Sequence, residues 1–92
     1  MPKDDDLDRL RAAVDVCNRR LVAVLQERGA LVRRIGACKR ARGLPAADPQ
    51  REQAMLAVML AAADPAGYPP DALRAILDAV LCASRDLAAD PR

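Results

Sequence analysis

Three basic residues occupy positions where a packed helix normally carries apolar side chains. From Leu7 to Arg42, every third or fourth residue falls on one line, which is the heptad spacing of a helix that packs along its length. Arg11, Arg28 and Lys39 all lie on this line. A buried unpaired charge is very costly, so cations that point inward require anionic partners. Two explanations are possible. The cations either snorkel to solvent or pair with acids between helices, or they form a site for an anionic small molecule.

The spacing of these cations along a helix separates them into two groups. Arg28 and Lys39 share a face at about 16 Å along the axis, so their long side chains can converge on one small molecule. Arg11 lies about 25 Å from Arg28, which is too far for the same small ligand within one chain. In an antiparallel dimer, however, Arg11 of one subunit can approach the region of Arg28 and Lys39 of the other.

A second group of charged residues opens the next predicted helix. Asp48 is typical of an N-cap, and Pro49 suits the first helical position. Arg51 follows in the first turn, where Asp48 and Glu52 can orient it. A helix cap with surface ion pairs explains these residues without any ligand. A hydrogen bond between helices likewise explains Ser84, which lies on an apolar line.

The composition argues against several kinds of catalytic and metal-binding site. Histidine is absent, so the commonest general base and metal ligand is missing, and we expect no cofactor and no metal. Cys17, Cys38 and Cys82 lie on or beside apolar helical positions without a CxxC pair, which predicts buried reduced thiols. The first residues do not resemble a signal peptide, and no stretch is apolar enough to span a membrane, so we predict a cytoplasmic protein.

The elements that position these residues are three helices in one domain, residues 1–92. Hydrophobic residues make up 52% of the chain and aromatic residues only 1%, which suits closely packed helices built on Ala, Leu and Val. The expected helices run from Leu7 to about Arg42, stopped by Gly43; from the Asp48 cap to about Ala63; and from about Pro70 to Ala88. Residues 1–6 and 89–92 are expected to be disordered.

The lengths of these helices predict an all-α homodimer. The first helix is about 50 Å long, whereas the second and third reach only about 22 Å and 28 Å. They cannot cover the first helix in a compact monomer, so part of its apolar line would stay exposed. Packing the long helices of two copies together is the natural solution.

The same residues resemble the all-helical chorismate mutases, which form intertwined dimers. The resemblance covers about Leu7 to Leu87 without a gap. Its motifs are Leu10-Arg11, Glu27-Arg28, Ile35-Gly36-Ala37-Cys38-Lys39, Asp48-Pro49-Gln50-Arg51-Glu52, and Ser84 after an apolar stripe. The joint spacing of the four cations and Glu52 is the specific part of this resemblance.

The resemblance implies the rearrangement of chorismate to prephenate, a step of the shikimate pathway of aromatic amino acid biosynthesis. In this family, arginines hold the two carboxylates of the substrate, and the partner subunit donates one of them. The position matching the donated residue is Arg11, and Arg28 and Arg51 would serve from the home subunit. The reaction is unimolecular, so catalysis can come from locking the reactive conformer and from cations placed where negative charge develops.

The resemblance assigns the remaining polar residues to other parts of the substrate. Lys39 would hydrogen-bond the ether oxygen of the breaking C–O bond and a carboxylate. Glu52, with the backbone near Asp48, would hold the ring hydroxyl. Ser84 would lie near a substrate carboxylate.

Two positions depart from the family pattern. Ala88 stands where a carboxamide or carboxyl side chain usually gives the second hydrogen bond to the ether oxygen, and Arg85 stands where the family often has an apolar residue. Losing one such donor costs on the order of 10²–10³ in rate. Four explanations stay open: Lys39 acts alone, Arg85 or another polar group substitutes, the enzyme has low activity, or an activating partner enzyme reshapes the third helix.

Other functions stay open at the level of sequence. An isochorismate-pyruvate lyase or an amino-deoxychorismate mutase would share this scaffold. The first helix carries ten Lys/Arg against three acids, which also fits a nucleic-acid-binding or helical dimerisation module. The chain lacks an aromatic platform for stacking bases, which counts against nucleic acid. A non-catalytic relative that serves as a scaffold is the last alternative.

Overall fold

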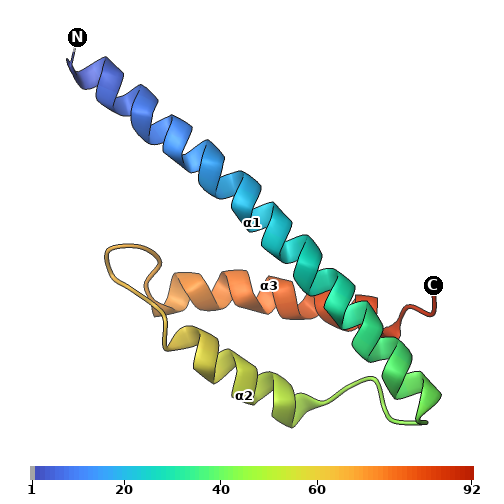
Figure 1. Ribbon diagram of the computed structural model, residues 1–92. Coiled ribbons are helices and arrows are strands. Elements are labelled where there is room, and N and C mark those ends of the chain that lie inside the picture. The colour runs from blue at the N-terminus through green and yellow to red at the C-terminus, as the bar shows by residue number, and fades with distance from the viewer. Residues whose placement is uncertain (1) are drawn as a thin grey trace. The chain divides into compact units, whose positions relative to one another are not determined.

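The computed structural model describes residues 2–92, with side chains from Asp5 onward. It contains three helices, α1 (Pro2–Ala41), α2 (Pro49–Leu60) and α3 (Pro70–Ala89), and no strand in this described part (Figure 1). The predicted all-α fold is therefore confirmed. The chain divides into two units, Met1–Leu31 and Val32–Arg92, and α1 continues from the first unit into the second.

The first unit consists of the N-terminal part of α1. The helix begins at Pro2, so the predicted start at Leu7 is wrong, and residues 2–6, which we expected to be disordered, are drawn as helix. Met1 lies outside the described residues. Proline suits the first helical position, and acids such as Asp5 and Asp6 are favourable near the positive end of a helix. These acids therefore lie inside the helix, before the predicted start at Leu7.

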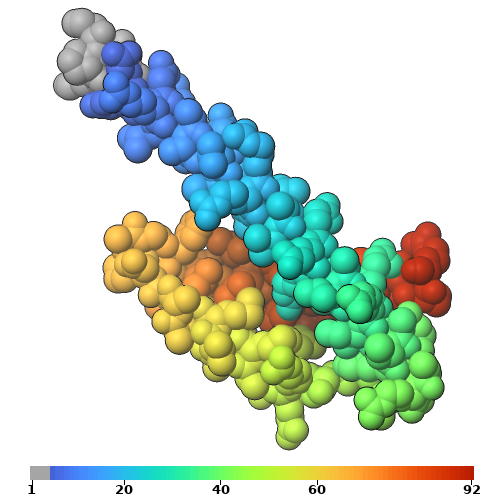
Figure 2. Space-filling model, in the orientation of Figure 1, coloured from blue at the N-terminus to red at the C-terminus, as the bar shows by residue number. Residues whose placement is uncertain are grey.

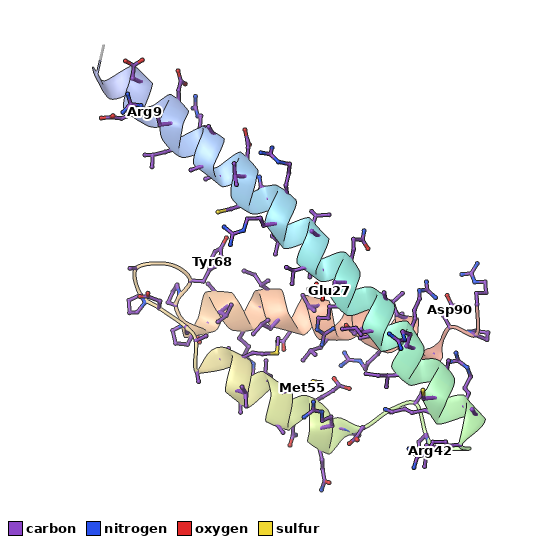
Figure 3. All side chains as sticks on the ribbon, in the orientation of Figure 1. Arg9, Glu27, Arg42, Met55, Tyr68 and Asp90 are labelled. Atoms are coloured by element: carbon purple, nitrogen blue, oxygen red, sulfur yellow. The ribbon has the colours of Figure 1, made fainter. Side chains whose placement is uncertain are left out.

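The apolar side chains of the first unit have no core to enter. Figure 3 shows side chains projecting from both sides of the helix between Arg9 and Glu27. Cys17 is also exposed, so its predicted burial is wrong in the single chain. The exposed large apolar residues of this unit are Leu7, Leu10, Val14, Val16, Leu21, Val22, Val24, Leu25 and Leu31.

The end of α1 lies in the second unit and is closed by a glycine motif. Gly43 has a φ of 67°, a left-handed conformation that glycine adopts without steric cost. The N–H of Leu44 donates to the carbonyl of Lys39 at 2.8 Å, and the N–H of Gly43 donates to that of Arg40 at 3.2 Å. This is the hydrogen-bond pattern of a Schellman motif, and it confirms the predicted stop at Gly43.

The start of α2 follows the predicted cap. The Asp48 carboxylate accepts a hydrogen bond from the backbone N–H of Arg51 at 3.1 Å, and Pro49 occupies the first helical position. The helix ends at Leu60, three residues before the predicted end at Ala63. The loop that follows carries Tyr68, labelled in Figure 3, and leads to α3, whose range agrees with the prediction.

Packing within the second unit is centred on α2 and α3, which contact each other. Leu81 of α3 is 5% exposed and is the one buried hydrophobic side chain among the described residues. The apolar stripe of α2, represented in Figure 3 by the labelled Met55, is half-buried, and in Figure 2 α2 forms part of the visible surface. Cys38 and Cys82 are exposed, so the prediction of buried thiols is wrong for them as well.

The last turns of α1 and α3 approach each other closely at Gly36. A Cβ atom built on Gly36 would lie 2.4 Å from the carbonyl oxygen of Ala88, so only glycine fits without movement. Nη1 of Arg40 donates to the same carbonyl oxygen at 2.9 Å. The backbone of Ala88 is therefore fixed from α1 by one close packing contact and one hydrogen bond.

The end of the chain also contacts α1, although we expected residues 89–92 to be disordered. Ala89 closes α3, and Asp90, labelled in Figure 3, pairs with Nη1 of Arg33 at 3.1 Å. The backbone N–H and the guanidinium of Arg92 also donate to the Asp90 carboxylate. The bonds from Arg92, then that from Arg33, hold the pKa of Asp90 below its usual value.

No helix in the part of the chain that the structure describes has the length and apolarity needed to cross a membrane.

Replacing Gly36 by Ala should destabilise the protein. Alanine favours a helix over glycine by about 0.5–1 kcal/mol, but overpacking against the fixed backbone of Ala88 costs about 1–3 kcal/mol. We expect a net loss of about 1–2 kcal/mol in the free energy of unfolding, measured by urea denaturation. Gly67→Ala is the control, because the nearest atom to its added Cβ lies 3.9 Å away. Equal stability of the Gly36→Ala variant and the wild type would show that α3 does not approach Gly36 this closely.

Replacing Asp90 by Asn should lower stability at neutral pH only. A pKa that is depressed in the folded state contributes stability above the unfolded value, about 3.9, and this contribution is lost as the pH falls below it. The urea midpoint of Asp90→Asn should therefore lie below that of the wild type at pH 7, with a smaller difference at pH 3. Asp86→Asn, an exposed acid of α3, serves as the control. A difference that is equally large at both pH values would contradict the proposed ion pair.

Candidate active site

The second unit contains an open pocket of about 440 Å³ between α2 and α3. Its lining comes from the loop before α2 and from one face of each helix. The lining residues are Ala47, Pro49, Glu52, Gln53, Leu56, Asp78, Leu81 and Arg85. The α2 positions follow the pattern i, i+3, i+4, i+7 and the α3 positions the pattern i, i+3, i+7, so each set lies on a single helical face.

The charged side chains of the pocket are two acids and one cation. Glu52 comes from α2, while Asp78 and Arg85 come from α3. Leu56 and Leu81 supply apolar surface. The pocket therefore combines apolar walls with a few polar groups, as small-molecule sites usually do.

Glu52 and Arg85 form an ion pair across the two helices. Nη1 of Arg85 donates to Oε1 of Glu52, and the side chains of Arg85 and Glu52 are 52% and 24% exposed, respectively. The hydrogen bond to Glu52, and secondly the charge of Glu52, raise the pKa of Arg85 above its usual value. The predicted acceptor for the ring hydroxyl is thus present in the pocket, paired with Arg85, which departs from the family pattern.

Lys39 is bonded to the loop before α2, next to a residue that lines the pocket. Its Nζ donates to the carbonyl oxygen of Ala46 at 3.1 Å, and the next residue, Ala47, lines the pocket. The side chain is half-buried. An ammonium group has three donors, and Ala46 uses one of them, so further bonds to a ligand are chemically available.

Asp48 and Arg51 act here as parts of the α2 start. The Asp48 side chain caps the backbone of Arg51, as the explanation without a ligand predicted. Arg51 is exposed and does not line the pocket. Its predicted role in binding a carboxylate therefore remains a prediction.

Ser84 and Ala88 lie on α3 outside the pocket lining. The hydroxyl of half-buried Ser84 donates to the carbonyl oxygen of Val80 at 2.6 Å, one turn earlier in the same helix. To donate to a substrate carboxylate, the Ser84 hydroxyl would have to break its hydrogen bond to Val80. Ala88 has only a methyl side chain, and its carbonyl is bound by Arg40, so this position offers no side-chain donor.

Arg11 and Arg28 lie on α1 in the first unit. Arg11 is exposed, and Arg28 is half-buried. The structure thus brings Glu52 and Arg85 together and bonds Lys39 to Ala46 in the loop before α2, all within the second unit. The sequence did not mark four of the lining residues as candidates: Gln53, Leu56, Asp78 and Leu81. Their helical spacing was the available signal, but it does not show which faces of the two helices meet.

The described residues contain no group of three or more Cys, Asp or Glu side chains arranged to hold a metal ion.

Comparison with protein families identifies the group to which the chain is related. The family model described as chorismate mutase type II matches residues 10–89, which include most of α1 and all of α2 and α3. The chain belongs to this family. The resemblance inferred from the spacing of Arg11, Arg28, Lys39, Arg51 and Glu52 is therefore confirmed at the level of the family.

Individual chorismate mutase structures agree with this result. Form II of chorismate mutase from Thermus thermophilus is 38% identical, with a TM-score of 0.84 over 92% of this chain and 96% of that one. Form I of chorismate mutase from the same organism is also 38% identical, with a TM-score of 0.78 over 85% and 96% of the two chains. The T-protein of Enterobacter agglomerans is 36% identical over 76 residues, which are 83% of this chain but only 20% of that protein.

Proposed function

We propose that this protein converts chorismate to prephenate. The observation that supports this most directly is the match to the chorismate mutase type II family over residues 10–89. It favours the enzyme over the nucleic-acid-binding module and the scaffold that the basic first helix also allowed. The cytoplasmic location and an activating partner enzyme remain predictions.

The proposed mechanism uses this chain's own cations. Arg28 and Arg51 bind the carboxylates of the substrate, and Lys39 donates to the ether oxygen of the breaking bond. Negative charge develops on that oxygen, so a positioned ammonium group lowers the barrier. The arginines hold a flexible dianion in its reactive conformer, which saves the entropy of reaching that conformer during the reaction.

In this proposal the Glu52 carboxylate accepts a hydrogen bond from the ring hydroxyl of the substrate. Its carboxylate binds one donor from Arg85 through Oε1, and a carboxylate can accept about four hydrogen bonds. The ion pair therefore leaves capacity for the substrate. Ala88 supplies no second donor to the ether oxygen, so we expect modest turnover unless another group takes that place.

The active form is proposed to be a homodimer. The first unit is a helix whose apolar residues, such as Leu10 and Val24, are 65% and 60% exposed. A large exposed apolar surface indicates an interface, and a second copy of the same helix offers a matching apolar line. In such a dimer Arg11 would enter the site of the partner subunit.

The reaction is tested by following the loss of chorismate absorbance and identifying prephenate as the product. Arg28→Ala should lower kcat/KM by about 10² or more, because a carboxylate contact that holds the substrate in its reactive conformer is removed. Arg34→Ala, an exposed arginine of the same helix, should retain wild-type activity. Helicity measured by circular dichroism should be unchanged in both variants. Pyruvate release from isochorismate, with no turnover of chorismate, would instead indicate the lyase.

Shared active sites predict complementation between two inactive variants. Arg11→Ala and Arg28→Ala subunits should each be inactive as homodimers. A mixed dimer contains one site that has both native arginines, so an equilibrated mixture should recover about a quarter of wild-type activity. Mass spectrometry under native conditions confirms that mixed dimers have formed. Mixed dimers without activity would exclude the donation of Arg11 across the interface.

A further inference from the structure

We propose that Arg85 is a specificity-determining residue that binds a carboxylate of the substrate, and that Glu52 positions its guanidinium for this contact. The inference rests on the proposed function, because it assumes a dicarboxylate substrate. It gives a role to a residue that the family pattern does not explain. It also places that role on the α2–α3 wall of the pocket, apart from the cations of α1.

The charge of the pocket is the first argument. Glu52 and Asp78 are the acids of the lining, and Arg85 is its one cation within the described residues. Without Arg85, the lining would carry two negative charges and would repel a dianion. Arg74 offsets Asp78 only weakly, since its Nε lies 3.8 Å from Oδ2 and both side chains are more than half exposed. With Arg85 the lining carries a net charge of −1 instead of −2, and Arg85 is the lining group that can attract a carboxylate.

The donor geometry of Arg85 is the second argument. A guanidinium carries five N–H donors in a planar fork, and the ion pair with Glu52 uses Nη1. The remaining donors can bind both oxygens of a carboxylate, which is the arrangement that arginine favours. Because arginine has no acceptor, it cannot accept a hydrogen bond from the ring hydroxyl, and that role stays with Glu52.

The exposure of Arg85 separates this role from a structural one. Its side chain is 52% exposed, and ion pairs at such positions contribute little to stability. Removing its charge should therefore leave the fold intact. A contact with a substrate carboxylate is present both before and during the reaction, so its loss raises KM and leaves kcat nearly unchanged. A donor to the ether oxygen would show the opposite pattern.

The test compares Arg85→Gln and Arg85→Lys with the wild type in steady-state assays with chorismate. We expect KM to rise about tenfold or more in Arg85→Gln, with kcat changed less than about threefold. Arg85→Lys should show a smaller rise, because it keeps the charge but loses the fork. Arg74→Gln is the matched control, with the same charge change on the same helix outside the pocket, and should resemble the wild type. Thermal midpoints should agree among all four proteins.

Binding of prephenate, measured by isothermal titration calorimetry, tests the same contact without turnover. Prephenate also carries two carboxylates, so its affinity should fall about tenfold or more in Arg85→Gln. Unchanged KM and unchanged prephenate affinity would overturn the inference, as would a fall in kcat at constant KM. If the wild type does not turn over chorismate, the proposed function itself fails. If the wild type is active and the KM of Arg85→Gln equals that of the wild type, only the proposed role of Arg85 is wrong.

Discussion

The close approach of Gly36 to Ala88 fixes the end of α3 against the last turns of α1. A side chain at position 36 would strike the carbonyl oxygen of Ala88, and Arg40 binds that oxygen from the same helix. The axial position of α3 is therefore set near its C-terminus. Arg85 lies one turn before Ala88, so the same contact determines where its side chain meets α2. The pocket depends on a packing contact that contributes no atom to its lining.

The local signals in the sequence predicted the second and third helices and the stop of the first. Gly43 and the Asp48 cap act through hydrogen bonds to residues only a few positions away, so their effect can be read without knowing the fold. The start of α1 was predicted wrongly because an acid before a helix and an acid inside its first turns are both favourable near the positive end. The sequence does not distinguish these two cases.

The features that escaped prediction depend on contacts between distant residues. Pairing of Glu52 with Arg85, and of Arg33 with Asp90, requires knowing which faces of two helices meet. Exposure of the three cysteines has a related cause. The periodicity correctly marks the apolar side of a helix, but it does not say whether another element of the same chain covers that side. In the first unit, apolar side chains such as those of Leu10 and Val24 are exposed.

The exposed apolar surface of the first unit has a consequence for how this protein folds. A chain that completes its core with a second copy does not fold in one step and associate in another, because on the proposed dimer the two processes are a single reaction. The stability of such a dimer then depends on protein concentration, as in other obligate dimers. Dilution alone would shift the equilibrium toward unfolded chains, without heat or denaturant. The amount of protein that a cell makes would thus help determine the fraction that is folded.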